Sequence, residues 1–260
     1  SFVFFIDFFE SKVALITGGA GGIGFAVAEL LIQKGIAHVI LIDTNKNMLE
    51  ESACKLDSER VHTCILDITK EIEVKNAIKK INEKYKRIDL LVNMAGIAGP
   101  SARTENYSFD AFQKVFSVNV FGTFLMMKYC LPFMQKQKSG SIVNACSCSG
   151  LMGYKLEIGY GSSKSAVLGM TRNAAAENGS NGVRINCISP GWVHTGMLEN
   201  ILEQYANTDG GYTMETLRNG TMLRPAAPYE IANTVCFLLS KDASYINGAN
   251  FICDGGKTLE

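Results

Sequence analysis

Short apolar segments alternate along the chain with longer segments of helical periodicity, from Lys12 to the C-terminus. The apolar segments are continuous and rich in β-branched residues, which is typical of parallel strands that are covered on both faces. They occupy residues 12–17, 38–43, 61–67, 88–93, 141–145, 183–188 and 249–254. The pattern therefore predicts a parallel sheet of seven strands.

The segments between the predicted strands have the periodicity of amphipathic helices. The first begins at about Gly22 and is expected to end at Gly35, because glycine commonly caps a helix C-terminus. A later segment carries a stripe of apolar residues about 3.6 positions apart, with lysines and glutamates opposite. The stripe consists of Ile72, Val74, Ile78, Ile81 and Tyr85. Strands and helices that alternate this often predict a single doubly wound α/β domain, the Rossmann architecture, with right-handed crossovers.

Two segments depart from this alternation. Residues 192–227 are long, irregular and rich in methionine, and we expect them to form a lid over a substrate site. Residues 1–10 contain five phenylalanines, are too short to cross a bilayer and lack the charged flank of a signal peptide. We expect this Phe-rich arm to pack on the domain, residues 11–260, or on a partner subunit. A membrane-touching arm and the remnant of an anchor are the alternatives.

Charge and composition exclude some classes of function. The chain has 260 residues, of which 47% are hydrophobic, enough for one large domain with its own core. Its 25 lysines and arginines balance 25 aspartates and glutamates, so no basic surface indicates nucleic acid binding. The formal net charge of zero favours self-association. We expect no transmembrane segment.

The eight cysteines indicate a reducing compartment. Most of them lie inside apolar runs, where a thiol acts as a small hydrophobic side chain. Cys146 and Cys148 form a C-x-C pair, but no second pair has the spacing of a zinc site and the three histidines are scattered, so no metal is predicted. Reduced, buried thiols suit a cytoplasmic protein better than a secreted one.

A glycine-rich turn follows the first predicted strand. In "TGGAGGIG", residues 17–24, Gly18, Gly22 and Gly24 let the backbone turn tightly and approach a pyrophosphate at the N-terminus of the next helix. Asp43 ends the second strand, where a carboxylate accepts hydrogen bonds from the ribose hydroxyls and repels a 2′-phosphate. No lysine or arginine occurs at positions 19–21 or 44 to neutralise such a phosphate, which favours NAD over NADP.

Two further strand ends could contact the adenine ring. Asp67 closes the third strand, and the small residues of "NMAG", 93–96, leave room for a ring at the end of the fourth. A plain structural role at a strand end remains an alternative for both.

The sequence "YGSSK", residues 160–164, carries a candidate acid/base pair. In a helix, Tyr160 and Lys164 share one face, and a nearby ammonium favours the phenolate form of tyrosine, which can then act as a base near neutral pH. The alternative is a half-buried tyrosine beside a solvated lysine.

The order of the motifs resembles that of the short-chain dehydrogenase/reductase family. "TGGAGGIG" is followed by "NMAG", "SVNVFG" (117–122), "SIVNACS" (141–147), "YGSSK" and "PGWVHT" (190–195), and the resemblance runs from residue 12 to residue 256. Two positions depart from the family pattern. Met94 replaces the second asparagine of N-N-A-G, and Cys146 stands where serine is common, which we interpret as packing.

The resemblance implies a catalytic set. Tyr160 would be the general acid/base, and Lys164 would lower its pKa and hold the nicotinamide ribose. Ser147 would hydrogen-bond the substrate oxygen, and Asn119 would keep a water in a proton relay. The implied cofactor residues are Gly18, Gly22, Ile23, Gly24, Asp43, Asp67, Ile68, Asn93, Ala95, Gly96, Tyr160, Lys164, Pro190, Gly191, Val193 and Thr195. The family also implies a homotetramer, or a dimer, assembled through helices near 109–137 and 160–178.

We interpret the chain as an NAD-dependent oxidoreductase that interconverts a secondary alcohol and a ketone. The predicted substrate pocket is mostly apolar and includes Cys148, Met152, Tyr154, Trp192 and Met197. This favours a fairly hydrophobic substrate such as a terpenoid, a steroid or a lipid-derived ketone, unless these residues merely close a lid over the core. A non-redox cyclase or isomerase on the same scaffold and a nucleotide-sensing binding protein are the alternatives.

Overall fold

Within residues 8–206 and 221–259, which the computed structural model describes, seven parallel strands form one sheet in the order β3-β2-β1-β4-β5-β6-β7. The strands are β1 Val13–Thr17, β2 His38–Asp43, β3 Val61–Ile65, β4 Leu90–Asn93, β5 Gly140–Ala145, β6 Val183–Pro190 and β7 Asn250–Cys253. Every predicted apolar segment is a strand, so the predicted seven-stranded Rossmann sheet is confirmed.

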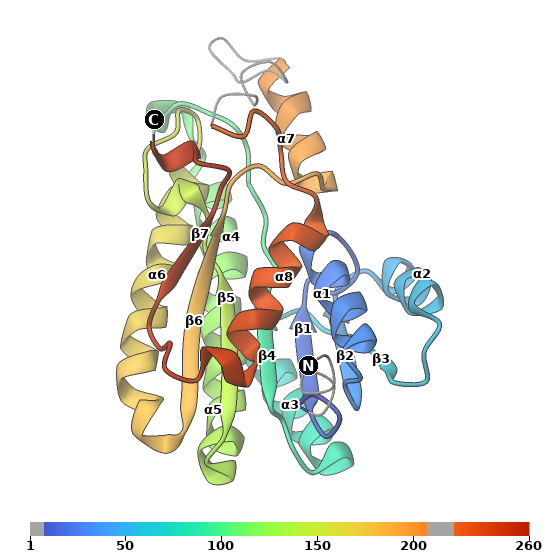
Figure 1. Ribbon diagram of the computed structural model, residues 1–260. Coiled ribbons are helices and arrows are strands. Elements are labelled where there is room, and N and C mark those ends of the chain that lie inside the picture. Colours follow the sequence, from blue (N-terminus) through green and yellow to red (C-terminus); the bar gives the residue numbers. More distant parts are fainter. Residues whose placement is uncertain (1–7, 207–220, 260) are drawn as a thin grey trace.

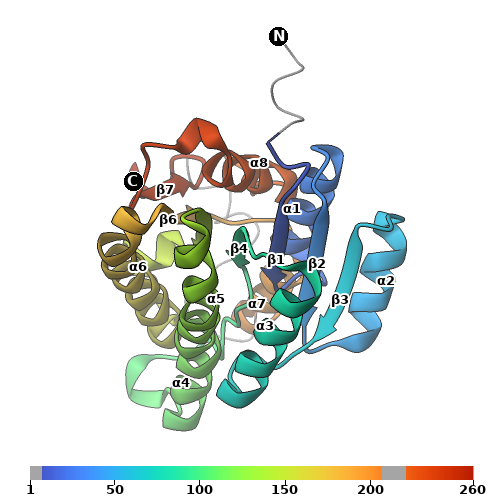
Figure 2. The same ribbon diagram turned by 90° about the horizontal axis from the view of Figure 1, so that it is seen from below.

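Helices cover both faces of the sheet (Figures 1 and 2). They are α1 Gly22–Gln33, α2 Lys46–Leu56, α3 Glu71–Tyr85, α4 Phe109–Phe116, α5 Thr123–Gln137, α6 Ile158–Asn178, α7 Gly196–Ala206 and α8 Pro228–Leu239. Seen from below, α1 and α8 lie on one side of the sheet, and α3, α5 and α6 lie on the other (Figure 2).

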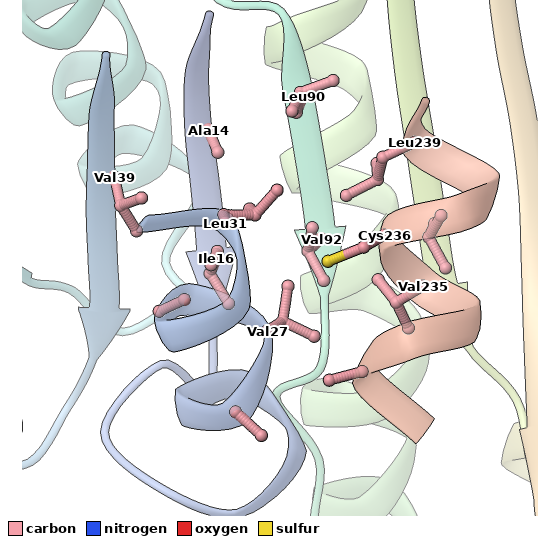
Figure 3. Packing of buried hydrophobic residues seen from close by; sticks show 14 of the residues in the cluster. Ala14, Ile16, Val27, Leu31, Val39, Leu90, Val92, Val235, Cys236 and Leu239 are labelled. Carbon is pink, nitrogen blue, oxygen red and sulfur yellow. The ribbon is translucent and has the colours of Figure 1, made fainter. Parts of the chain in front are cut away.

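The two-sided cover explains why the strands lack polar alternation. Ala14 and Ile16 of β1 belong to a cluster with residues of α1 and α8, as Figure 3 shows. Val13 and Leu15 point the other way and join a second cluster with α3 and α5. All four side chains are at most 2% exposed, so a polar residue facing either side of the sheet would be buried.

The helix predictions hold with one exception. Gly35, just beyond the end of α1, has a φ of +80°, the left-handed conformation expected of a helix-ending glycine. In α3, Val74, Ile78 and Ile81 are buried, but Ile72 is 76% exposed, so its place in the apolar stripe is wrong. Ile72 stands two positions before Val74, and two positions in a helix point to nearly opposite sides.

The longest helical segment, Phe109–Gln137, runs through α4, a π-helical turn Ser117–Gly122, and α5. By length and composition alone it could cross a membrane, but half of its most apolar window is buried inside the domain. Leu125, Met126 and Met127 pack in the second core cluster. The segment therefore has the packing of a core helix.

The two segments that departed from the alternation behave differently from each other. Phe9 of the Phe-rich arm is 1% exposed and packs in the first core cluster, whereas residues 1–7 lie outside the described residues. The predicted irregular lid contains the regular helix α7, because Leu198, Ile201 and Tyr205 are buried at helical spacing. Residues 207–220 of that lid lie outside the described residues.

Candidate active site

A cavity of about 650 Å³ is lined by residues at the carboxyl edge of the sheet and by residues of α7. Figure 1 shows α7 beyond this edge of the sheet. The cavity is lined by residues that follow six strands, and it includes the ends of β1 and β4, between which the strand order reverses. Ligands of open α/β sheets bind at this kind of switch point. The predicted residues that line it are Gly18, Gly22, Ile23, Gly24, Asp43, Asp67, Ile68, Ala95, Gly96, Ser147, Cys148, Tyr160, Lys164, Pro190, Gly191, Trp192, Val193, Thr195 and Met197.

The glycine-rich turn after β1 forms one end of the cavity. Gly22 has a φ of +53°, and a Cβ on Gly24 would collide with the carbonyl oxygen of Gly18, so side chains do not fit at these positions. Helix α1 begins at Gly22 without a side-chain cap and without an acidic residue in its first turn. Its first amide groups are therefore available to an anionic ligand such as a pyrophosphate.

Two carboxylates stand beside this turn at the ends of neighbouring strands. Asp43 lines the cavity, and its Oδ1 atom accepts a hydrogen bond from the Asn45 amide at 3.2 Å. The Oδ1 atom of Asp67 accepts hydrogen bonds from the Thr69 amide at 2.9 Å and from its hydroxyl at 2.7 Å. Burial raises the pKa of Asp67, but these hydrogen bonds outweigh it and hold the pKa below its usual value. Asp67 can therefore remain ionised near neutral pH.

The end of β4 contributes small residues to the cavity, but not its asparagine. Ala95 and Gly96 line the cavity, as does Met94. Asn93 is 2% exposed and lies outside the lining, and its amide donates a hydrogen bond to Asn144 Oδ1 at 2.8 Å. The side chain of Asn93 therefore links β4 to β5, and the contact of Asn93 with the cofactor stays a prediction.

Tyr160, Ser147 and Lys164 meet at one wall of the cavity. Tyr160 and Lys164 lie one turn apart near the start of α6, and Lys164 Nζ is 5.5 Å from the centre of the Tyr160 ring. The same Nζ donates a hydrogen bond to the carbonyl oxygen of Ala145 at 2.8 Å. A side-chain hydrogen bond joins Ser147 to Tyr160. Lys164 is only 4% exposed, which excludes the alternative of a solvated lysine.

Burial dominates the ionisation of this pair. It raises the pKa of Tyr160, with a further contribution from the negative charge of Glu157, and the hydrogen bond from Ser147 opposes the shift. The direction is opposite to the lowering that the family resemblance implied, because removing a phenolate from water costs more than its neighbours return. Burial also lowers the pKa of Lys164 to about 8, so the lysine remains mostly protonated at neutral pH.

Asn119 lies behind the pair, in the π-helical turn Ser117–Gly122. Its amide donates hydrogen bonds to the Ile97 carbonyl at 3.0 Å and to the Ser163 hydroxyl at 2.9 Å, and its Oδ1 accepts from the Ile97 amide. A Cβ on Gly96 would lie 3.2 Å from Asn119 Oδ1 and 3.4 Å from Lys164 Nζ. The side chain therefore fastens the end of β4 to α6 next to the lysine. π-Helical turns often occur at functional sites.

The segment after β6 folds back toward the glycine-rich turn. A Cβ on Gly22 would lie 3.2 Å from Thr195 Cγ2, and a Cβ on Gly191 would lie 2.9 Å from the Cα atom of Asp254. Val193 pairs with Ala226 in an isolated bridge that anchors the segment. The segment thus closes the cavity on the side where the resemblance implied contacts with a nicotinamide.

Another part of the cavity lining is apolar. Trp192 and Met197 pack against a buried cluster of Leu156, Ile201 and Tyr205. Two predicted pocket residues, Met152 and Tyr154, do not line the cavity. The Tyr154 hydroxyl lies 3.4 Å from Cys148 Sγ, and its ring is edge-on to Trp192 with ring centres 6.2 Å apart. Tyr154 therefore supports the wall from behind.

Sequence reasoning missed an acidic residue at this wall. Glu157 lines the cavity, and its Oε1 atom accepts a hydrogen bond from the Tyr205 hydroxyl at 2.7 Å. The sequence did offer a signal for Glu157: it stands three residues before Tyr160, about one helical turn away, a spacing at which two helical side chains are neighbours. Cys146, by contrast, packs with Leu168 and Cys187, as we interpreted from the sequence.

The residues present fit a nicotinamide dinucleotide. The glycine turn provides free amides and space for a pyrophosphate, and Asp43 provides an acceptor for ribose hydroxyls. Ile68, Ala95 and Gly96 leave an apolar slot between the two ends of the cavity.

Known proteins match this chain over most of its length. Residues 18–258 match the family model described as enoyl-(acyl carrier protein) reductase. The chain is 38% identical to levodione reductase of Leifsonia aquatica over 259 residues, which cover 96% of this chain and 95% of that protein. It is also 38% identical to xanthoxin dehydrogenase of Arabidopsis thaliana over 257 residues, which cover 95% of this chain and 90% of that protein.

Solved structures show the same fold. Levodione reductase superposes with a TM-score of 0.92 at 37% identity, covering 96% of this chain and 99% of that one. NAD⁺-bound xylitol dehydrogenase has a TM-score of 0.91 at 30% identity, covering 95% and 99%. ElxO with NADP bound has a TM-score of 0.87 at 33% identity, covering 96% and 99%. The matching family model, the relatives and the shared fold show that the chain belongs to the short-chain dehydrogenase/reductase family of nicotinamide-dependent oxidoreductases.

Proposed function

We propose that this protein interconverts a secondary alcohol and a ketone with NAD as its redox cofactor. The observation that carries the proposal is the meeting of Tyr160, Ser147 and Lys164 at one wall of a cavity that also holds the glycine turn and Asp43. Relatives named as a reductase and a dehydrogenase support the class of reaction.

The proposed chemistry is a proton transfer at the substrate oxygen. The hydroxyl groups of Ser147 and Tyr160 lie together and can both donate hydrogen bonds to one oxygen, where negative charge develops during reduction. Tyr160 gives its proton to that oxygen during reduction and accepts a proton during oxidation. A bound nicotinamide would supply or accept the hydride.

Burial affects the protonation of Tyr160 and of Lys164 in different ways. Because burial raises the pKa of Tyr160, the phenol rests in its proton-donating form. The ammonium of Lys164, 5.5 Å from the centre of the ring, stabilises the phenolate that remains after the transfer. Asn119 holds α6 against the end of β4, which keeps the lysine in place.

The preference for NAD rests on the half-buried Asp43. Its carboxylate would accept hydrogen bonds from the ribose hydroxyls and repel a 2′-phosphate. Positions 19–21 and 44 carry no basic side chain that would neutralise such a phosphate. This supports NAD rather than NADP.

The apolar wall supports a mostly hydrophobic substrate. Among the described residues that line the cavity, the only basic side chains are Lys114 and Lys164. Lys164 is held by Ala145, and Lys114 lies close enough to Asp67 to lower its pKa, at the adenosine end. Neither is placed to bind a substrate carboxylate, so a terpenoid, a steroid or a similar apolar ketone fits best.

Absorbance at the reduced-nicotinamide band tests the proposal. The purified protein is mixed with NAD and a panel of cyclic, steroidal and linear secondary alcohols, and with reduced NAD and the matching ketones. Parallel reactions contain NADP and its reduced form. We expect turnover of apolar members with NAD. Conversion of a substrate without any absorbance change would favour the non-redox alternative, and efficient turnover of only carboxylated or sugar substrates would overturn the substrate class.

A further inference from the structure

The carboxyl group of Glu157 has a binding capacity that the proposed proton transfer does not use. Its Oε1 atom is held by the Tyr205 hydroxyl at 2.7 Å. Its Oε2 atom is buried and has no hydrogen-bond partner among residues 8–206 and 221–259. A buried carboxyl oxygen without a partner is unfavourable. Because Glu157 also lines the cavity, a donor on a bound ligand could supply the missing hydrogen bond.

The backbone holds this side chain in a defined place. Leu156, the preceding residue, has a φ of +68°, a left-handed conformation that is costly for a leucine. Its carbonyl accepts a hydrogen bond from the Ala102 amide at 3.2 Å, and Ala102 forms a parallel bridge with Glu157. Backbone conformations of this kind concentrate at binding sites, where the surrounding structure maintains them. Glu157 is therefore fixed from two sides, by Ala102 and by Tyr205.

The surroundings of Glu157 make its carboxyl group unfavourable for stability unless the group binds a ligand. Burial raises the pKa of Glu157, although the hydrogen bond from Tyr205 and the nearby Ser149 side chain oppose the shift. The neighbouring wall consists of Leu156, Ile201 and Trp192. In such a wall, a leucine or methionine would pack without an unpaired oxygen. The carboxyl group also raises the pKa of Tyr160, so it gives no help to the tyrosine as a base.

We infer that Glu157 accepts a hydrogen bond from a second hydroxyl group of the substrate. The inference rests on the proposed function, because it takes the reacting oxygen to lie at Tyr160. The preferred substrate is then a mostly apolar secondary alcohol or ketone that carries one further hydroxyl at the distance from Tyr160 to Glu157. A substrate carboxylate at the same place would be repelled whenever Glu157 is ionised.

Trp192 provides a direct measure of binding, because it is the single tryptophan of the chain and lines the same cavity. Cyclohexanol and the three positional isomers of cyclohexanediol are titrated into the NAD-loaded Tyr160→Phe protein, in which turnover does not consume the probe. Tryptophan fluorescence gives each dissociation constant. We expect at least one diol to bind about tenfold more tightly than cyclohexanol, as one additional hydrogen bond at a buried site provides.

Variants of Glu157 in the same background decide the inference. Glu157→Leu should reduce the preference for that diol to about twofold or less while cyclohexanol binds as before, and Glu157→Gln should reduce it by about threefold. Glu199→Gln, at an exposed position of α7, should leave it unchanged. The inference is overturned if no diol is preferred, or if the preference survives both substitutions. If Glu157→Leu does not fold, Glu157→Gln alone decides.

Failure of the proposed function would be seen in a different measurement. It would appear as an absence of nicotinamide turnover in the parent protein, or as turnover that persists in Tyr160→Phe. The ratio of the diol and cyclohexanol dissociation constants depends on neither result.

Discussion

Replacing Asp43 by serine should shift the cofactor preference of this protein away from NAD. The Oδ1 atom of Asp43 is held by the Asn45 amide at 3.2 Å, and its other oxygen has no partner among the described residues. A hydrogen bond to a charged group contributes about 1.5–3 kcal/mol, and the lower value applies to a half-buried side chain. Loss of repulsion toward a 2′-phosphate adds about 1 kcal/mol. The sum, about 2.5 kcal/mol, corresponds to a roughly 60-fold fall in the ratio of kcat/KM for NAD to kcat/KM for NADP.

The assay compares both cofactors with the same alcohol in the parent, in Asp43→Ser and in a control, Asp242→Ser. Asp242 is exposed and lies outside the cavity, so its replacement should leave the ratio unchanged. A ratio in Asp43→Ser that stays within twofold of the parent value would refute the reasoning. So would a parent protein that prefers NADP, because the carboxylate would then not select against the phosphate.

Three further predictions concern stability and assembly. Lys164 has a pKa of about 8 in the fold and 10.5 when unfolded, so the unfolded chain binds more protons between these values. The unfolding free energy of the parent, relative to that of Lys164→Met, should therefore rise with pH across this window, by about 3 kcal/mol at most. Denaturant titrations measure it, and a difference that does not change with pH would contradict the prediction. Leu31→Ala should lower the unfolding free energy by about 3 kcal/mol because Leu31 is fully buried, whereas Ile72→Ala should change it by less than about 0.5 kcal/mol because Ile72 is exposed. Similar losses at both positions would contradict the packing described for α1. We also expect solution scattering to show a homotetramer. Phe121→Asp should convert it to smaller species, because the exposed ring of Phe121 lies on the long helical segment. A monomeric parent protein would contradict this prediction.

Local patterns were sufficient to predict most of the fold. Continuous apolar segments identify strands whose two faces are both covered, and residues such as Val13 and Ala14 are indeed buried in opposite clusters. The error at Ile72 arose because the stripe included both Ile72 and Val74, whose side chains point to nearly opposite sides of a helix. The helix α7 was missed although its sequence is rich in helix-forming residues, because residues 192–227 were interpreted as one irregular segment.

In the candidate site, too, the features formed by residues close in sequence were predictable, whereas those formed by distant residues were not. The glycine turn and the Tyr160–Lys164 pair are each local in sequence, so their spacing predicts their geometry. The pairing of Glu157 with Tyr205 joins residues 48 positions apart and has no local signature. The direction of the Tyr160 pKa shift could not be predicted either, because it depends on how deeply the finished fold buries the phenol.

The central claim is that the phenol of Tyr160 transfers the proton of the reaction. The most direct measurement compares Tyr160→Phe with the parent for NAD binding, by quenching of the Trp192 fluorescence, and for turnover, by nicotinamide absorbance. The substitution removes one oxygen from a ring at the cavity wall and leaves the glycine turn and Asp43 unchanged. We predict that turnover falls by at least about a hundredfold, as loss of a general acid/base requires, while the NAD dissociation constant changes by less than about threefold. Turnover within a few fold of the parent would contradict the account.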